Sequence, residues 1–154
     1  CAIAENTGYT VNYVNSELID EERCIKVEVE DTNVASPYKN IITVRLTTEK
    51  QALSISATIF EDDVQRIVDI DGFEVDVALK GNMIIFKNTD VPGVIGNVGT
   101  ILANHDVNIS DFRLGRNDKS EALAVILLDS DVTEAAMDEL SKLEACISVK
   151  AVRL

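Results

Sequence analysis

The sequence predicts an α+β protein, in which a partial antiparallel sheet precedes a second sheet that carries two helices on one face. The first half of the chain contains short segments that alternate apolar and polar residues, as half-buried strands do. The second half interleaves strand-like segments with two segments of helical periodicity. Hydrophobic residues make up 46% of the 154 residues and charged residues 27%, which is typical of globular rather than disordered chains.

The first half is predicted to form an antiparallel sheet after a mixed N-terminal segment. Near the N-terminus, the pattern predicts strands over residues 10–15 and 25–30, and Ser16 can cap a helix over residues 17–23. Turn residues then separate four further strands, predicted over residues 41–48, 52–60, 66–70 and 73–79.

The second half predicts the order β-α-β-β-α-β, which is the ferredoxin-like motif. The strands are expected over residues 82–87, 109–116, 122–128 and 147–152, and the helices over residues 94–105 and 134–143, the second capped by Thr133. Both helices must pack on one face of the sheet, which leaves the other face in need of a partner. The turn at residues 80–82 predicts two domains, 1–80 and 81–154.

Charge and composition exclude several classes of function. The net charge of −13, without a basic patch, argues against binding to nucleic acid or to anionic membranes. The longest apolar run, residues 122–128, is far shorter than the roughly 20 residues that span a bilayer. Cys1, Cys24 and Cys146 lack metal-ligand spacing and fit reduced thiols in a cytoplasmic protein. Because the chain opens with Cys rather than Met, we expect a fragment.

The residues do not predict catalysis. His105 is the single histidine, and its place at the end of a predicted helix is typical of a structural residue. Phosphate-binding and dinucleotide-binding glycine motifs are absent from the sequence. The spacing of Gly93, Gly96 and Gly99 instead predicts a helix stripe that packs closely against a neighbour. We expect no catalytic site, no cofactor and no metal in this chain.

The junction between residues 88 and 95 predicts a ligand site. The free backbone N–H groups at the start of the helix, near Val94 and Ile95, favour an anion. Asp90 and the carboxamides of Asn88 and Asn108 can bind an ammonium group, because the turn before the second strand is expected to return to the same end of the sheet. Together these groups suit a small zwitterionic amino acid. Alternatively, Asp90 and Asn108 only cap a helix and a turn.

At these residues the sequence resembles a known family. The segment GNMIIFKNTDVPGVIGNVGTILANHDVNISDFRLGR is similar to the ACT domain at the end of many bacterial D-3-phosphoglycerate dehydrogenases. The earlier segments VNYVNSELIDEERCIKV, KNIITVRLTT and RIVDIDGFEVD resemble the intervening domain of the same enzymes. The resemblance covers residues 11–154 and keeps the family's domain order.

The resemblance implies a regulatory fragment, whose parent enzyme oxidises 3-phosphoglycerate with NAD in serine biosynthesis. It implies that L-serine, or a similar small amino acid, binds between two ACT domains of a homodimer, with pairing into tetramers left open. One subunit would supply Asn88, Asp90 and the backbone near Val94 and Ile95, and the other subunit would supply Asn108.

Some residues depart from the family pattern. Val91 stands where the family usually has Arg, and Cys24 replaces a Gly. In some members the intervening domain binds an anion. Arg66 matches one of those basic positions and predicts a second site, although Ala78 occupies another such position.

Two other interpretations remain open from the sequence. The chain can be a dimerisation module that binds no small molecule. It can also be the regulatory part of an L-serine dehydratase, although the Ser-rich segment and cluster cysteines of that enzyme are missing from the sequence.

Overall fold

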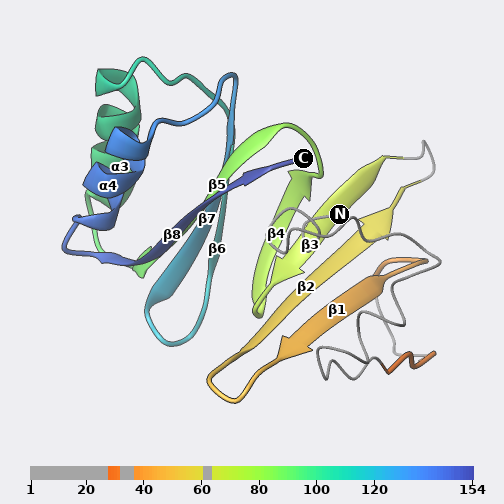
Figure 1. Ribbon diagram of the computed structural model, residues 1–154. Helices are drawn as coiled ribbons and strands as arrows, with labels where there is room; N and C mark the ends of the chain where they lie inside the picture. The colour runs from red at the N-terminus through yellow and green to blue at the C-terminus, as the bar shows by residue number, and fades with distance from the viewer. Residues whose placement is uncertain (1–27, 32–36, 61–63) are drawn as a thin grey trace, which may run out of the picture. The chain divides into compact units, whose positions relative to one another are not determined.

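The computed structural model describes residues 28–31, 37–60 and 64–154 of the chain. The chain divides into two compact units, Cys1–Ala35 and Ser36–Leu154. The described part of the second unit contains two antiparallel sheets of four strands each, and the second sheet carries two helices (Figure 1). The predicted α+β class is confirmed.

The first sheet is formed by the alternating segments of the first half of the chain. Its four strands lie in sequence order, and each pairs antiparallel with the next. The strands are β1 Ile42–Thr47, β2 Ala52–Ile59, β3 Gln65–Ile70 and β4 Phe73–Ala78. Each strand matches its predicted segment to within one residue at either end. Short connections favour this order, because an antiparallel partner can begin as soon as the chain has turned.

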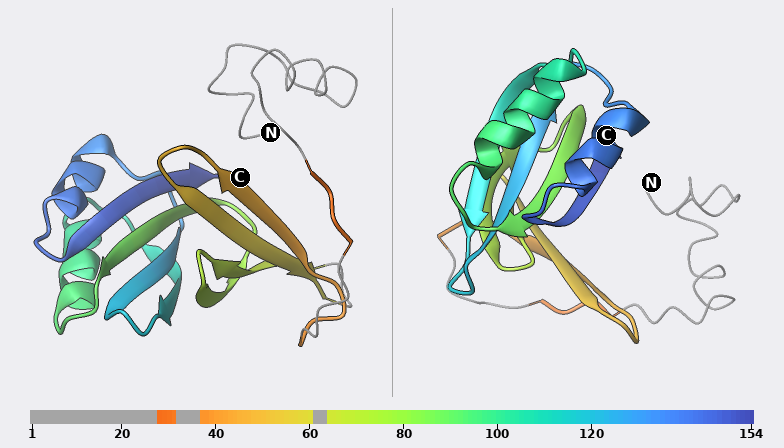
Figure 2. Two further views of the ribbon diagram at one scale, coloured as in Figure 1. Left: turned by 90° about the horizontal axis from the view of Figure 1, so that it is seen from below. Right: turned by 90° about the vertical axis from the view of Figure 1, so that its left-hand side faces the viewer.

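The second sheet has the predicted order of strands and helices along the chain. The elements are β5 Asn82–Thr89, α3 Val94–Asn104, β6 Ile109–Arg116, β7 Glu121–Leu128, α4 Glu134–Ser141 and β8 Cys146–Arg153. The strands lie side by side in the order β6-β7-β5-β8, so β6 and β8 are the edges. Both β5 and β6 pair antiparallel with β7 and therefore run parallel to each other. Both helices lie on the same face of this sheet (Figure 2).

Strand β7 is buried on both of its faces. Every residue from 122 to 128 is buried. On one face, Ile126 shares a core with Leu102 of α3. On the other face, Val125 shares a second core with Val77 of β4. Each such side chain contributes about 1.5–3 kcal/mol relative to an exposed one. The sheet face without a predicted partner is thus covered by β3 and β4 of the first sheet.

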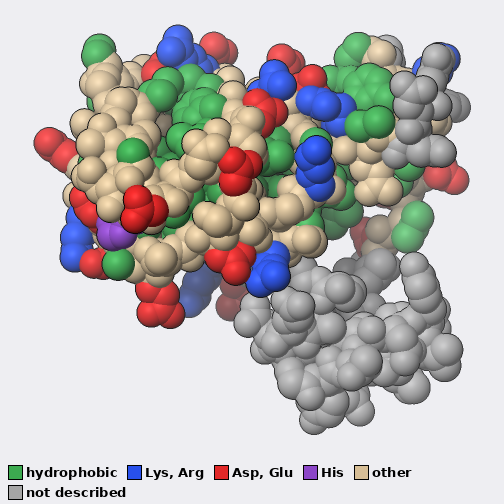
Figure 3. All heavy atoms as spheres, turned by 90° about the horizontal axis from the view of Figure 1, so that it is seen from above, with side chains coloured by type: hydrophobic (Ala, Val, Ile, Leu, Met, Phe, Trp, Pro, Cys, Tyr) green, Lys and Arg blue, Asp and Glu red, His purple; other side chains and the backbone are tan. Residues whose placement is uncertain are grey.

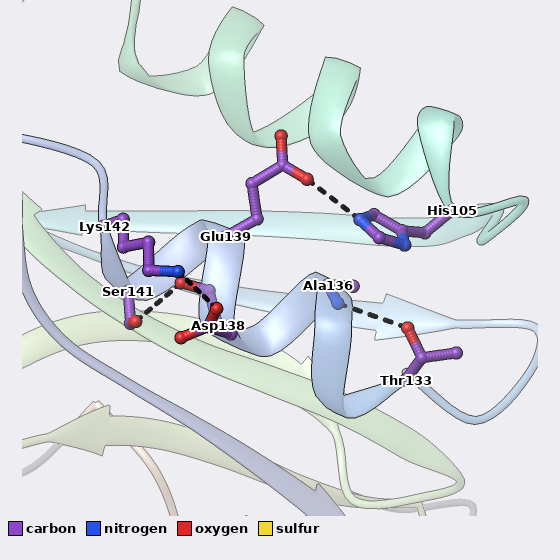
Figure 4. Close-up of polar contacts among 7 residues, drawn as sticks. All are labelled: His105, Thr133, Ala136, Asp138, Glu139, Ser141 and Lys142. Atoms are coloured by element: carbon purple, nitrogen blue, oxygen red, sulfur yellow. Dashed lines mark hydrogen bonds and ion pairs between the residues drawn. The ribbon is translucent and has the colours of Figure 1, made fainter.

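Polar contacts fix helix α4 and join it to the end of α3 (Figure 4). The Thr133 hydroxyl accepts a hydrogen bond from the Ala136 N–H at 3.2 Å, which confirms the predicted cap. The Glu139 carboxylate lies 2.9 Å from Nε2 of His105, the C-cap residue that directly follows α3. The single histidine of the sequence therefore contributes a contact between the two helices.

The turn between β6 and β7 is held by the side chain of Asn117. Its Oδ1 accepts hydrogen bonds from the N–H groups of Lys119 at 2.9 Å and Glu121 at 3.1 Å. Its Nδ2 donates to the Glu121 carboxylate at 3.0 Å, and Nζ of Lys87 lies 3.0 Å from the same carboxylate. The hydrogen bond from Asn117, helped by Lys87, lowers the pKa of Glu121 below its usual value.

One predicted strand is wrong in the part of it that the structure describes. Two other predicted elements lie outside the described residues. The strand expected over residues 25–30 is absent from residues 28–31, where Val29 is 89% exposed. A strand requires a neighbour that pairs its N–H and C=O groups, and neither of the two described sheets includes residues 28–31. The strand predicted over residues 10–15 and the helix predicted over residues 17–23 are outside the described part of the chain.

Gly115 of β6 allows the two sheets to approach closely. A Cβ atom at this position would lie 2.6 Å from the carbonyl oxygen of Glu74 and 3.1 Å from Cβ of Phe73. Both atoms belong to β4 and cannot move aside as a flexible side-chain end can. A methyl group on Gly115 would therefore push β4 away from β6.

We expect Gly115→Ala to lower the free energy of unfolding by about 1–3 kcal/mol, as overpacking does. Urea denaturation of the whole chain measures this change. Gly99→Ala is the control, because a Cβ at Gly99 of α3 would meet nothing within 4 Å. Since alanine favours helix, the control is expected to be neutral or to stabilise by up to about 1 kcal/mol. Equal stabilities of the two variants would contradict the close approach at Gly115.

The lowered pKa of Glu121 predicts a loss of stability in acid. The unfolded chain binds this proton near the usual pKa of 4.5, whereas the folded chain binds it only at lower pH. The stabilisation is therefore complete above the unfolded pKa and is lost as the pH falls through the folded pKa. As the pH falls below the usual pKa of 4.5, we expect the urea midpoint to fall more steeply in the wild type than in Glu121→Gln. Identical pH dependence in both proteins would refute this role of Glu121.

Candidate functional site

A pocket of about 340 Å³ opens where β5 ends and α3 begins. Its floor is apolar and is formed in part by core residues of the sheet and of α3, such as Phe86 and Val98. Four of the residues predicted for the ligand site line this pocket: Asn88, Asp90, Val94 and Ile95. The pocket therefore joins an apolar floor to polar groups at the end of β5.

The start of α3 presents backbone N–H groups to this pocket. Gly93 precedes the helix with a φ of 92°, a left-handed conformation that glycine adopts readily. The first hydrogen bond of the helix runs from the Asn97 N–H to the Gly93 carbonyl at 3.0 Å. The N–H groups of Val94, Ile95 and Gly96 thus lack an intrahelical partner, and no side chain of the described residues caps the helix. Together with the helix dipole, these donors favour an anionic group.

Asn88 and Asp90 reach the pocket from the end of β5. Asn88 is 4% exposed, and its Nδ2 donates a hydrogen bond to the Thr89 carbonyl at 2.7 Å. Asp90 is half-buried, and its backbone N–H donates to the Ser120 carbonyl at 2.8 Å. This bond ties the loop after β5 to the turn between β6 and β7. The pocket therefore offers a carboxylate, on an anchored backbone, that can accept hydrogen bonds from an ammonium group.

Arg116 is a pocket residue that the sequence analysis missed. It ends β6 and lines the pocket, and its Nε lies 3.3 Å from Oδ2 of Asp90. Asn88 and Arg116 both lie opposite Ala122 of β7, so the ends of β5 and β6 are side by side. The predicted motif could have indicated Arg116. It places two parallel strands on either side of a common neighbour, and such strands end at the same edge of a sheet.

Asn108 does not line this pocket. The prediction that the turn before β6 brings Asn108 to the same end of the sheet as Asn88 is wrong within one chain. β6 begins at Ile109, which pairs with Leu128, and Leu128 pairs with Asn82 at the start of β5. The start of β6 therefore lies at the opposite end of the sheet from Asn88, roughly 20–25 Å away along the strand. The physical reason is the crossover: α3 carries the chain from the end of one parallel strand to the start of the next.

Arg66, predicted for a second site that binds an anion, is engaged by a carboxylate. Its Nε contacts Oδ1 of Asp76, and its Nη2 donates to the Asp76 carbonyl at 3.0 Å. Across the β3–β4 pair, Arg66 lies directly opposite Ala78, the other position discussed for this site. An anion at Arg66 would compete with the Asp76 carboxylate, and the second site stays a prediction.

Other surfaces of the described chain offer less specific chemistry. No group of three or more His, Cys, Asp or Glu side chains in the described residues could hold a metal ion. Burial raises the pKa of the Cys146 thiol, which makes it less reactive. On the face drawn in Figure 3, basic side chains are interspersed with acidic ones. Neither helix in the described residues has the length and apolar character needed to cross a bilayer.

Two known domains match the chain, in the order that the resemblance implies. Residues 2–71 match the D-3-phosphoglycerate dehydrogenase intervening domain, and residues 82–145 match the ACT domain. The pocket at the β5–α3 junction lies within the second match.

Curated relatives align with nearly the whole chain. The D-3-phosphoglycerate dehydrogenase of Bacillus subtilis is 33% identical over 146 residues, and that of Archaeoglobus fulgidus is 30% identical over 147 residues; each alignment covers 94% of this chain and 28% of the relative. The Synechocystis enzyme is 28% identical over 146 residues, which are 94% of this chain and 26% of the relative. The chain thus spans little more than a quarter of these relatives. The chain therefore carries an intervening domain and an ACT domain in the order found in D-3-phosphoglycerate dehydrogenases.

Proposed function

We propose that this chain is the regulatory part of a D-3-phosphoglycerate dehydrogenase in the cytoplasm, and that its ACT domain binds L-serine between two copies of the chain. Bound serine then exerts feedback control on the NAD-dependent oxidation of 3-phosphoglycerate by the catalytic part of the enzyme. The observation that carries this proposal is the pocket at the β5–α3 junction, which combines groups of opposite character within one small space.

The chemistry of the pocket supports an amino acid as the ligand. The unpaired N–H groups at the start of α3 favour a carboxylate, and Asp90 favours an ammonium group. Asn88 adds a buried carboxamide, which can donate and accept hydrogen bonds. ACT domains in general bind small amino acids and form oligomers.

The open edge of β6 supports a site that two copies build together. Because β6 is an edge strand, its outer N–H and C=O groups can pair with another strand. Antiparallel pairing of two β6 strands about a two-fold axis sets the start of each strand beside the end of the other. Asn108 of one copy then lies near Asp90 and Arg116 of the other. This arrangement reconciles the distant position of Asn108 in one chain with its role in the site.

The shared core of the two sheets supports a route for regulation. Serine can shift the enzyme between two states only by binding one of them more tightly. A ligand between two ACT domains favours one orientation of those domains. Because β7 packs against β3 and β4, the first sheet follows the movement of the ACT sheet.

We expect L-serine to bind the wild-type chain and to bind Asp90→Ala or Asn108→Ala about 10- to 100-fold more weakly, because each variant loses a hydrogen-bonding partner of a charged ligand. Isothermal titration calorimetry measures this loss. Mixing the two variants tests whether Asp90 and Asn108 of one binding site come from different copies of the chain. A mixed dimer has one pocket with both residues intact, so the mixture should regain wild-type affinity in a fraction of its sites.

Two outcomes would contradict this prediction. The absence of heat with millimolar serine for the wild type would leave a dimerisation module without a ligand. Unchanged weak binding in the mixture would place the site within one copy. Arg153→Gln on β8, the opposite edge strand, is the control and should bind serine as the wild type does.

The charges on β6 predict the register of the dimer. Asp111 and Arg113 flank Phe112 near the middle of the strand. If the two-fold axis passes through Phe112, Asp111 of each copy lies opposite Arg113 of the other. The same register sets Asn108 opposite Arg116.

We therefore expect Arg113→Asp to weaken the dimer by about tenfold, because attraction is replaced by repulsion at two symmetric positions. Adding Asp111→Arg in the same chain should restore the affinity. Sedimentation equilibrium measures the dimer dissociation constants of the single and the double variant. A double variant that is as weak as the single one would exclude this register.

A further inference from the structure

We infer that Arg116 binds the carboxylate group of the amino-acid ligand and makes the pocket selective for a zwitterion. This inference rests on the proposed function, and it assigns a specificity-determining role to a residue outside the motif that predicted the site. It is carried by the geometry of the Asp90–Arg116 pair and by the charge of the pocket.

The contact between Arg116 and Asp90 is open to replacement by a ligand. The distance of 3.3 Å between Nε and Oδ2 is longer than the roughly 2.7–2.9 Å of a strong charge-assisted hydrogen bond. The side chain of Arg116 is 64% exposed and that of Asp90 is 32% exposed. Exposed pairs of this kind hold their partners weakly. A ligand that carries both charges can therefore insert between the two side chains.

The charge of the pocket requires a cation beside Asp90. The chain as a whole carries a net charge of −13, so an anionic group approaches it against repulsion. Among the described residues, Asp90 and Arg116 are the two charged residues that line the pocket, and together they are neutral. An amino acid is also neutral overall, with its ammonium group suited to Asp90. The planar guanidinium of Arg116 can bind the carboxylate through two parallel hydrogen bonds.

Arg116 is held near the pocket by groups other than Asp90. It directly precedes Asn117, whose side chain closes the turn between β6 and β7. The same turn is tied to the loop after β5 by the bond from the Asp90 N–H to the Ser120 carbonyl at 2.8 Å. The backbone of both charged residues therefore stays at the pocket when a ligand separates their side chains.

Arg116 also supplies the positive charge that is missing at Val91. That residue stands where the resemblance expects an arginine, lines the pocket and is 46% exposed. A guanidinium reaches the same pocket from the end of β6 instead. The positive charge is retained, and its source is a strand that is distant in sequence.

Calorimetric titration of the whole chain with L-serine and L-serinamide tests the role of Arg116. Serinamide keeps the ammonium and hydroxyl groups and replaces the carboxylate with a neutral amide. We expect the wild type to prefer serine by about tenfold or more. In Arg116→Gln, serine should bind about 10- to 100-fold more weakly, while the affinity for serinamide changes by less than about threefold.

A second arginine–aspartate pair provides the matched control. Nη1 of Arg153 lies 3.5 Å from Oδ2 of Asp131, and these side chains are 78% and 67% exposed. Arg153→Gln removes the same charge away from the pocket and should keep the wild-type preference for serine.

The outcomes separate this inference from the proposed function. Equal weakening of serine and serinamide in Arg116→Gln would reduce Arg116 to a structural role, and wild-type affinities for both compounds would remove it from the site. Either result overturns the inference while serine binding by the wild type stands. A wild type that binds neither compound would overturn the proposed function itself.

Discussion

The burial of β7 on both faces is the constraint on which the rest of the described structure depends. A strand whose side chains are all apolar from residue 122 to residue 128 cannot lie at a surface without a large cost in exposed apolar area. Helices α3 and α4 cover one face of it, and β3 and β4 cover the other. The two sheets therefore form one structural unit within residues 36–154, and the close approach at Gly115 is a local consequence of that packing.

The candidate site follows from how the polar ends of this apolar sheet are arranged. Strands β5 and β6 run parallel on either side of β7, so their ends bring Asp90 and Arg116 together. A backbone hydrogen bond ties the two loops, and the positive φ of Gly93 lets α3 begin directly at the pocket. Opposite charges and helix-terminal donors are thus held in place by the fold rather than by their mutual attraction. Such an arrangement suits a ligand that carries both an ammonium group and a carboxylate.

The crossover through α3 also explains why a second copy belongs to the proposed mechanism. Asn108 is separated from the pocket of its own chain by the length of β6, and no local rearrangement of a hydrogen-bonded strand can remove that separation. A two-fold axis beside an edge strand removes it without any change in the fold, because antiparallel pairing exchanges the strand ends. A site that is complete only between copies links ligand binding to their relative orientation, which is a requirement for regulation through assembly.

The sequence by itself determined the elements of the described sheets, because the alternation in β4 and the apolar spacing in α3 reflect local periodicities that burial imposes on any strand or helix. It also predicted that Asn88, Asp90 and the start of α3 lie together, since they are neighbours along the chain, and all of them line one pocket. The position of Arg116, the covering of the second sheet by β3 and β4, and the separation of Asn108 depend on which strands become neighbours in space. Pairing between distant segments is set by the packing of the whole core, so only the tertiary structure decided them.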